Sequence, residues 1–361
     1  MTEIGRSCWC GAHSLEEFGP NYLRCSVCET LVGQAGLADE QTLVGDDEVD
    51  YYGKRYWLEH QRDGLSLPDI HVRVRDDLPE RCVHWLKALL RYRKPPARVL
   101  EVGAGHGAYT ALLRWAGYEA TALDLSAWVA EYSRGRFGIP YLVGPIEEQD
   151  LGAGSFDIVV ANDVLEHLAD PEETVRRWAE VLRPDGVLVI QTPEYPSGQS
   201  YEELVAGHDL FVEHMRASTE HLYLFSRPAL ELLLARVGLA EVAFHEPVYA
   251  YDMFCVAGAA PLVSGDDDGK VLEASSAVGP LVLALVDAHD AGVRLDAALK
   301  ESDADRQARL DVIERLDAAL RESEADREAQ AKVIAQQRGI GEHLRTGLRK
   351  VRANRRGKSS N

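Results

Sequence analysis

The sequence has no apolar run that approaches the roughly 20 residues needed to span a bilayer. Its first residues, Met1-Thr-Glu-Ile4, lack the basic and then apolar pattern of a secretory signal. We therefore expect a cytoplasmic protein. Basic residues are also scarce, since 39 Lys and Arg stand against 59 Asp and Glu and give a net charge of −20. This balance argues against a nucleic-acid partner, because phosphate contacts need a basic surface.

Cysteine is scarce as well, but four of the six cysteines lie within the first 28 residues. They form two pairs separated by fourteen residues, as in a structural zinc ribbon, and are Cys8, Cys10, Cys25 and Cys28. The first pair has only one intervening residue, so Cys10 with His13 is an alternative ligand pair. A reduced or disulfide-linked hairpin is the alternative to zinc. Cys82 and Cys255 sit in apolar stretches and are expected in the core.

Composition divides the chain into six segments. We expect a zinc-ribbon-like module at 1–45, a helical and aromatic lead-in that caps a substrate at 46–94, a main α/β domain at 95–258, a linker at 259–279, a helical coiled-coil segment at 280–340 and a basic disordered tail at 341–361. The proline doublet Pro95-Pro96 separates the lead-in from the main domain, because proline blocks helix continuation. The linker contains the acidic run 266–268.

Short apolar runs alternate with amphipathic helices across the main domain, which indicates an α/β sheet. Strands are expected at Arg98–Val102, Glu119–Leu123, Tyr141–Val143, Asp157–Ala161, Val187–Thr192, Glu241–His245 and Tyr249–Val256. Helices are expected near 79–93, 108–116, 126–136, 171–182 and 227–237. The connection 193–225 is long for such a fold, so we expect it to cover a substrate site.

The C-terminal segment contains an internal repeat, since Leu295-Asp-Ala-Ala-Leu-Lys-Glu-Ser returns after 21 residues as Leu316-Asp-Ala-Ala-Leu-Arg-Glu-Ser. An offset of three heptads predicts a coiled coil through 280–338 and a homo-oligomer, with a lone solvated helix as the alternative. Residues 345–361 hold seven Lys and Arg and no acid. They predict contact with an anionic surface, with a solvated terminus as the alternative.

A glycine loop follows the first strand of the main domain, as Gly103-Ala-Gly105-His-Gly107. Such a loop at a helix N-terminus lets backbone N–H groups approach a ligand closely. The loop also fits a dinucleotide fingerprint. Glu101, two residues earlier, suits a ligand with a positive amino group and a sulfonium better than a pyrophosphate. Asp124 ends the second strand, where it can accept ribose hydroxyls of either cofactor.

Four motifs resemble, in order and spacing, those of class I S-adenosylmethionine-dependent methyltransferases. They are Glu101-Val-Gly-Ala-Gly-His-Gly107, Leu123-Asp-Leu-Ser126, Phe156-Asp-Ile-Val-Val160 and Asp185-Gly-Val-Leu-Val-Ile190. The resemblance covers about 95–258. The cysteine cluster, the segment Tyr51-Tyr-x-x-x-Tyr-Trp57 and the stretch Glu220-His-Leu-Tyr-Leu-Phe-Ser226 resemble a subgroup often associated with bacterial glycan or sugar modification.

This resemblance implies a Rossmann-like sheet of seven strands whose last strand is antiparallel. It also implies a cofactor site formed by Glu101, Gly103, Gly105, Gly107, Asp124, Leu125, Ile146 and Asn162. In this family, the first four of these would surround the methionine part, Asp124 would hold the ribose and Leu125 would lie against the adenine. Pro145 stands where the family has an acid for the adenine amino group, so the Ile146 N–H would reach the adenine ring instead, with Glu147 nearby.

A hydroxyl acceptor benefits from a general base, because a neutral hydroxyl is a poor nucleophile. His106, His167, His221 and His245 lie near strand ends, and we select His167 and His221 as catalytic candidates. Asp163, Glu166 and His167 also resemble the pattern that supports a divalent metal in ubiquinone-biosynthesis O-methyltransferases, so Mg²⁺ is a further expectation. The alternative is that Asp163 and Glu166 form a capping box that starts a helix.

The sequence thus predicts a methyltransferase that uses S-adenosylmethionine and carries a structural zinc ion. We expect methyl transfer to a hydroxyl of a sugar, a glycan or a small-molecule acceptor. Transfer to carbon or nitrogen of a natural-product intermediate is one alternative. A non-catalytic scaffold with a methyltransferase fold is the other, and the intact Glu101, glycine loop and Asp124 speak against it.

Overall fold

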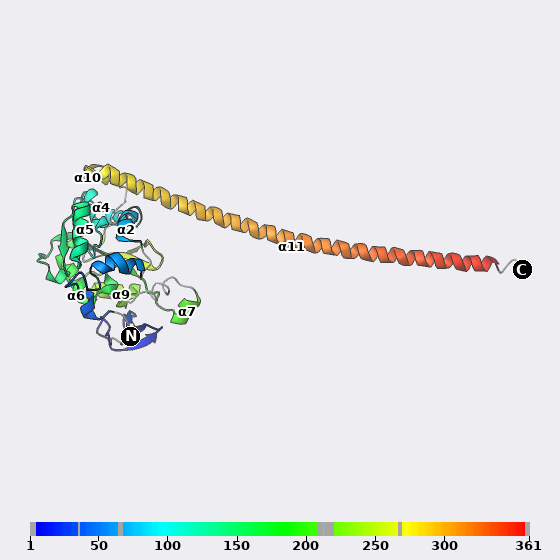
Figure 1. Ribbon diagram of the computed structural model, residues 1–361, viewed down its shortest axis with the longest axis horizontal. Coiled ribbons are helices and arrows are strands. Elements are labelled where there is room, and N and C mark those ends of the chain that lie inside the picture. Colours follow the sequence, from blue (N-terminus) through cyan, green and yellow to red (C-terminus); the bar gives the residue numbers. More distant parts are fainter. Residues whose placement is uncertain are drawn as a thin grey trace. The chain divides into compact units, whose positions relative to one another are not determined.

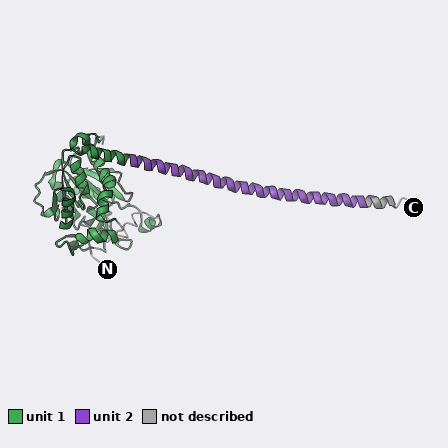
Figure 2. Cartoon of the chain, turned by 45° about the horizontal axis from the view of Figure 1, so that its top comes forward, with its two compact units in different colours: residues 1–290 green, residues 291–361 purple. Residues whose placement is uncertain are grey.

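The computed structural model describes residues 5–34, 37–63, 68–207, 212, 220–265 and 269–357. The chain forms two units, residues 1–290 and residues 291–361 (Figure 2). In the described ranges, no helix is both long and apolar enough to cross a membrane.

A seven-stranded sheet forms the centre of the first unit (Figure 1), as the resemblance implies. Its strands are β4 (Arg98–Val102), β5 (Glu119–Asp124), β6 (Tyr141–Val143), β7 (Phe156–Asn162), β8 (Leu182–Pro193), β10 (Glu241–His245) and β11 (Asp252–Gly258). Their order is β10-β11-β8-β7-β4-β5-β6. Strands β4 to β8 pair in parallel, and β11 runs antiparallel to both β8 and β10. The expected antiparallel strand is confirmed, although it begins at Asp252 instead of Tyr249.

Helices cover both faces of this sheet because its strands are apolar on both sides. On one face, Val99 and Ile158 pack against α3 (Val83–Leu90) and α4 (Ala108–Trp115). On the other face, Leu100 and Val159 pack against α6 (Pro171–Val181) and α9 (Arg227–Arg236). Buried apolar residues that alternate sides along a strand are typical of a doubly covered parallel sheet.

Side-chain caps fix where three of these helices begin. Ser126 accepts a hydrogen bond from the Val129 N–H and starts α5 (Ala127–Phe137). Asp170 and Ser226 do the same for α6 and α9, each of which has a proline in its first turn. Such caps satisfy backbone donors that would otherwise lack a partner, so the expected helices 126–136, 171–182 and 227–237 form close to their predicted bounds.

The lead-in folds into short helices beside the glycine loop. They are η2 (Tyr56–His60), α1 (Gln61–Asp63), α2 (Ile70–Asp76), η3 (Leu78–Cys82) and α3. The helix expected at 79–93 is therefore two elements, a π-helical turn and α3, and it ends at Leu90. Elsewhere the described chain forms η1 (Asp39–Thr42), η4 (Ile146–Glu148), η5 (Leu165–His167) and α7 (Tyr201–Ala206). The connection expected to cover a substrate lies partly outside the described residues, at 208–211 and 213–219.

A second, smaller sheet contains the N-terminal segment. Its strands are β1 (Leu15–Phe18), β2 (Tyr22–Cys25), β3 (Leu31–Gly33) and β9 (Tyr223–Leu224), in that order. Strand β9 follows the long connection of the main domain, so this sheet joins residues nearly 200 positions apart in the sequence.

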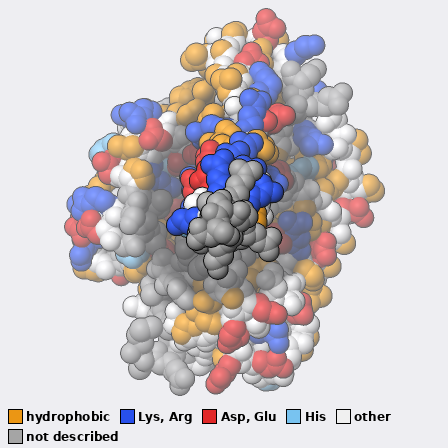
Figure 3. Space-filling view, turned by 90° about the vertical axis from the view of Figure 1, so that its right-hand side faces the viewer, with side chains coloured by type: hydrophobic (Ala, Val, Ile, Leu, Met, Phe, Trp, Pro, Cys, Tyr) orange, Lys and Arg blue, Asp and Glu red, His pale blue; other side chains and the backbone are white. Residues whose placement is uncertain are grey.

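Two expectations for the C-terminal part need correction. The linker 259–279 contains a short helix, α10 (Val271–Ser275), and the tail 341–361 is helical up to Gly357 as the end of α11 (Gly279–Gly357). The tail remains helical because strong helix formers continue through it and no proline interrupts them. Figure 3 looks toward the C-terminal end of α11, where Lys and Arg side chains gather. The acidic run 266–268 and residues 358–361 lie outside the described residues.

Candidate active site

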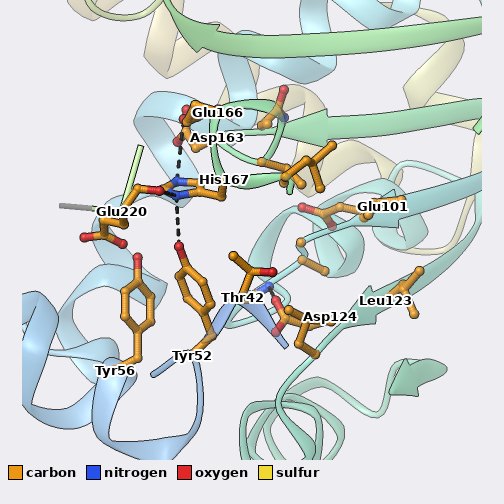
Figure 4. Close-up of a pocket in the computed structure, with 18 of the residues that line it drawn as sticks. Thr42, Tyr52, Tyr56, Glu101, Leu123, Asp124, Asp163, Glu166, His167 and Glu220 are labelled. Atoms are coloured by element: carbon orange, nitrogen blue, oxygen red, sulfur yellow. Dashed lines mark hydrogen bonds and ion pairs between the residues drawn. The ribbon is translucent and has the colours of Figure 1, made fainter. Parts of the chain in front are cut away.

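One cavity of about 860 Å³ opens at the carboxyl ends of β4, β5 and β7 (Figure 4). Parallel strands end at the same edge of a sheet, which is where α/β proteins bind ligands. The predicted site residues that line it are Glu101, Gly103, Gly105, Asp124, Leu125, Ile146, Asn162, Glu166, His167 and His221. The structure therefore brings together the expected cofactor residues, with one exception, and both catalytic candidates.

The exception is Gly107, which is not among the lining residues. It adopts a φ of +74° at the start of α4, and a Cβ there would lie 2.7 Å from Ile139 and 3.0 Å from Ser133. Gly107 is thus needed where α4 packs against neighbouring side chains. Gly103 and Gly105 also have positive φ angles, and the Gly105 N–H donates to Asp124 Oδ2 at 3.0 Å. This bond fixes the loop to the end of β5.

The two acids of the expected cofactor site are buried. Glu101 is 6% exposed and accepts a hydrogen bond from the Thr110 hydroxyl. Burial raises the pKa of the Glu101 carboxyl to about 8 and that of Asp124 to about 6. A cationic ligand would offset this cost, because an opposite charge nearby favours the ionised carboxylate.

Several buried polar atoms on the cavity wall have no hydrogen-bond partner in the described protein. They are both side-chain polar atoms of Asn162, the Tyr109 hydroxyl and Trp57 Nε1. Each such atom costs about 1–3 kcal/mol, so their concentration around one cavity favours a polar ligand. Donors and acceptors beside two acids and a glycine loop fit the amino-acid and nucleoside parts of S-adenosylmethionine.

His167 has a defined tautomer. Its Nδ1 lies 3.0 Å from the Glu220 carbonyl oxygen and 3.0 Å from the Tyr52 hydroxyl. A carbonyl can only accept, so Nδ1 carries the proton, and in the neutral ring Nε2 holds the lone pair. The His221 ring lies beside it, with the two ring centres 5.0 Å apart. His167 therefore offers a basic nitrogen within the cavity.

The interpretation of Asp163 and Glu166 as a capping box is wrong. Asp163 has a φ of +56°, and its carboxylate binds Arg81 and the Gln191 amide instead of capping a helix. The chain after it forms only the short turn η5.

The three residues expected to bind Mg²⁺, Asp163, Glu166 and His167, do not form one group either. The group close enough to share an ion contains Glu166, His167 and His221, without Asp163. Glu166 accepts from the Thr192 hydroxyl, and burial together with Asp163 raises its pKa to about 8.

The two remaining histidine candidates have other partners. His106 lines the cavity, but its Nε2 lies 2.9 Å from Asp77 and burial lowers its pKa. His245 lies on β10, bonds to the Tyr92 hydroxyl and is not among the residues that line the cavity.

Sequence reasoning missed several residues of the opposite wall. Arg81, from η3, packs between Trp85 and Tyr249 and pairs with Asp163. Asp252, at the start of β11, is 3% exposed, and burial raises its pKa to about 9. Only Asp252 carried a signal, as an acid at the start of an apolar strand. Tyr52 belongs to the aromatic lead-in, which was expected to cap the substrate as a segment.

The four N-terminal cysteines converge on one point. Their Sγ atoms all lie within 4.8 Å of one another, with 3.4 Å between Cys8 and Cys28 and 3.6 Å between Cys10 and Cys25. A tetrahedral zinc site with Zn–S bonds of about 2.3 Å separates its sulfurs by about 3.8 Å. The alternative ligand His13 is exposed and outside this group. Cys82 and Cys255 are buried in the core, as expected.

Comparisons with known proteins show which family this chain resembles. Residues 74–243 match the family described as "Methyltransferase domain". The ubiquinone biosynthesis O-methyltransferase of Xanthomonas axonopodis pv. citri is 30% identical over 178 residues, which cover 45% of this chain and 73% of that protein. The enzyme of the same name from Xanthomonas campestris pv. campestris is 29% identical over 167 residues, covering 42% and 69%.

Among solved structures, the CMeT domain of the citrinin polyketide synthase is 22% identical to this chain. The match has a TM-score of 0.40 and covers 52% of this chain and 54% of that domain.

The Glu101→Gln variant should change two measurable properties in different directions, the pH dependence of Tm and the affinity for S-adenosylmethionine. In the parent, burial raises the pKa of Glu101 from 4.5 to about 8, so ionisation of this carboxyl costs the folded protein stability as the pH rises between these values. A glutamine amide does not ionise and therefore carries no such cost. A carboxyl whose pKa is higher in the folded than in the unfolded protein stabilises the fold at pH values below the unfolded pKa. This stabilisation is lost as the pH rises to the folded pKa. The Tm of the variant relative to the parent should therefore rise by about 3 °C or more between pH 5 and pH 8.

Affinity for S-adenosylmethionine should fall at least about tenfold in the same variant, since one lost charge interaction costs 1.4 kcal/mol or more. Glu119→Gln, at an exposed position on β5, serves as the control. An unchanged pH dependence of Tm in Glu101→Gln would contradict the assignment of a buried, protonated Glu101.

Proposed function

Because this chain belongs to the S-adenosylmethionine-dependent methyltransferases, we propose that it methylates a hydroxyl of a carbohydrate-type or other small-molecule acceptor. The observation that carries this proposal is the position of His167. Its Nε2 lies 3.7 Å from Glu166 Oε1 and, in the neutral ring, can take a proton within the same cavity that holds the glycine loop, Glu101 and Asp124.

S-adenosylmethionine supplies an electrophilic methyl group on a sulfonium sulfur when it is bound. Glu101, Gly103, Gly105, Asp124, Leu125, Ile146 and Asn162 would hold it. The remaining requirement is a nucleophile, and the proton of an acceptor hydroxyl would pass to His167 Nε2. The Glu220 carbonyl holds the proton on Nδ1 and so keeps Nε2 available. His221, beside it, is the second candidate for this role.

The acceptor wall is aromatic and acidic. Tyr52, Tyr56 and Trp57 line one side, and Tyr249 and Tyr251 stack on the other with ring centres 5.4 Å apart. Aromatic faces suit the apolar face of a sugar ring or a flat aromatic acceptor, and buried carboxyls can bond to hydroxyl groups. The matched relatives carry the name of O-methyltransferases, which supports oxygen over carbon or nitrogen.

A zinc ion at the four cysteines is part of the proposal. The convergence of four thiols in a chain with short strands around them supports a structural role, since such small sheets need a staple. The enclosed cysteines leave no open coordination position beside an acid or base.

Helix α11 would join copies of this chain. The large apolar side chains of its repeat are exposed, including Leu295 at 71%, Leu299 at 60%, Leu316 at 65% and Leu320 at 57%. A stripe of exposed leucines at heptad spacing gains free energy when it is buried against a second copy. The basic segment 345–361 would contact an anionic surface.

The acceptor class can be tested with S-adenosylmethionine that carries a labelled methyl carbon. The protein is incubated with a nucleotide-linked sugar, a catechol, a primary amine and an enolisable ketone. We expect label on oxygen of one of the hydroxylic acceptors, read from the chemical shift of the methyl carbon. Label on nitrogen or carbon would contradict the proposal, and cofactor binding without any transfer would favour a scaffold.

His167→Gln should reduce transfer to that acceptor at least about 100-fold, because general base catalysis contributes about 10²–10⁴. The affinity for S-adenosylhomocysteine should change less than about threefold. His245→Gln, which alters a histidine bonded to Tyr92 on β10, is the matched control. Full activity in His167→Gln would remove it as the base, and loss of activity in His221→Gln alone would assign the role there.

The double variant Leu316→Asp with Leu320→Asp should convert the oligomer into a monomer in light scattering, while cofactor affinity remains unchanged. Ala318→Asp, on the opposite side of the same helical turn, controls for added charge. A monomeric parent protein would contradict the proposed role of α11.

A further inference from the structure

We propose that the four-cysteine module is a positioning device for the histidine site, so that metal binding at the cysteines fixes His167 and His221 while leaving the cofactor residues unaffected. This inference rests on the proposed function, because it assigns the module a part in presenting the acceptor base. The segment that links the two sites is residues 220–225.

The module continues into this segment as a sheet. Strand β3 pairs with β9, with Leu31 opposite Leu224 and Val32 opposite Tyr223. The Gly33 N–H then donates to the Leu222 carbonyl at 2.9 Å. Strand β9 is thus the last strand of the small sheet that contains the cysteine hairpin, and Leu222, just before it, continues the bonding to Gly33.

The same segment is bonded to the histidine site on its other side. The Leu222 N–H donates to the Glu166 carbonyl at 2.7 Å, and the Glu220 carbonyl accepts from His167 Nδ1 at 3.0 Å. Leu222 is therefore held between Gly33 of the module and Glu166 of η5. A shift of β3 would move the carbonyl that sets the His167 tautomer.

Two tyrosine hydroxyls strengthen this connection. Tyr22, on β2 and 3% exposed, donates to the His221 carbonyl at 3.2 Å. Tyr223, on β9, donates to the Ser7 carbonyl at 3.1 Å, next to Cys8. Hydrogen bonds that run in both directions hold the two segments in one register, so His221 is placed by the module directly.

The cysteines are placed where loss of metal would release β3. Cys25 ends β2, Cys28 lies in the turn that follows, and β3 begins at Leu31. The strands of this sheet have between two and four residues each. Strands this short are marginal without a further constraint, and metal binding supplies folding free energy in such modules.

The cofactor residues stand on other elements. Glu101 bonds to Thr110 of α4, and Asp124 bonds to Gly105 and Ser126. The far end of the linking segment is also anchored separately, because the Phe225 carbonyl accepts from the Tyr195 N–H at 2.8 Å. Metal loss should therefore affect residues 220–224 more than β4, β5 or the glycine loop.

Gly33 offers a way to disturb the connection without touching a cysteine. A Cβ at Gly33 would lie 3.1 Å from the His221 carbonyl oxygen and 3.3 Å from the Leu222 carbonyl oxygen. Gly33→Ala therefore pushes β3 and the linking segment apart. Gly5→Ala, whose Cβ would meet nothing within 4 Å, is the matched control.

The test compares the zinc-loaded full chain, the chelator-treated chain and the two glycine variants by hydrogen exchange and by calorimetric titration with S-adenosylhomocysteine. In treated protein, amides of 220–224 should exchange at least about tenfold faster, while amides of 98–124 and the Kd change less than about threefold. Added zinc should restore slow exchange. Gly33→Ala should accelerate exchange in 220–224 with zinc still bound, and Gly5→Ala should not.

Three results would overturn the inference. They are absence of bound zinc in the purified protein, unchanged exchange at 220–224 after zinc removal, and equal acceleration at 98–124, which would make the metal a general staple. A failure of S-adenosylhomocysteine to bind the zinc-loaded parent would instead contradict the proposed function. The exchange result and the binding result are thus read separately.

Discussion

The parallel pairing of β4 with β5 and β7 is the constraint on which the site depends. Val102 lies opposite Leu123 on one side and Ala161 on the other, so the three strands end together. The residues that follow, the glycine loop, Asp124 and Asn162, consequently meet at one edge of the sheet. Shifting β5 by one residue would exchange its two faces and turn Asp124 away from Gly105.

The cavity at this edge contains four buried carboxyl groups whose ionisation is unfavourable. Glu101, Asp124, Glu166 and Asp252 all have pKa values raised chiefly by burial. A protein keeps buried acids at a cost to its stability, and such groups concentrate where a ligand or a reaction uses them. The unpartnered atoms of Asn162 and Tyr109 add to this cost. A polar, cationic cofactor would relieve both.

Local patterns in the sequence predicted the sheet and many of the residues that line the cavity, because strand, glycine loop and terminal acid follow one another within a few residues. Contacts between distant segments were not predictable in this way. Arg81 reaches Asp163 across the cavity, and β3 joins β9 only through tertiary pairing. The predicted capping box at Asp163 is wrong for the same reason. The Asp163 carboxylate bonds to Arg81 and Gln191, which are distant in the sequence, and so does not cap the backbone that follows it.

The most direct test of this account is calorimetric titration of the full chain with S-adenosylhomocysteine, with NAD as the parallel ligand. We expect S-adenosylhomocysteine to bind with a Kd in the micromolar range and Asp124→Asn to weaken it at least about tenfold, as expected for one lost charged hydrogen bond. Binding of NAD alone, or affinity that Asp124→Asn leaves unchanged, would contradict the assignment of this cavity.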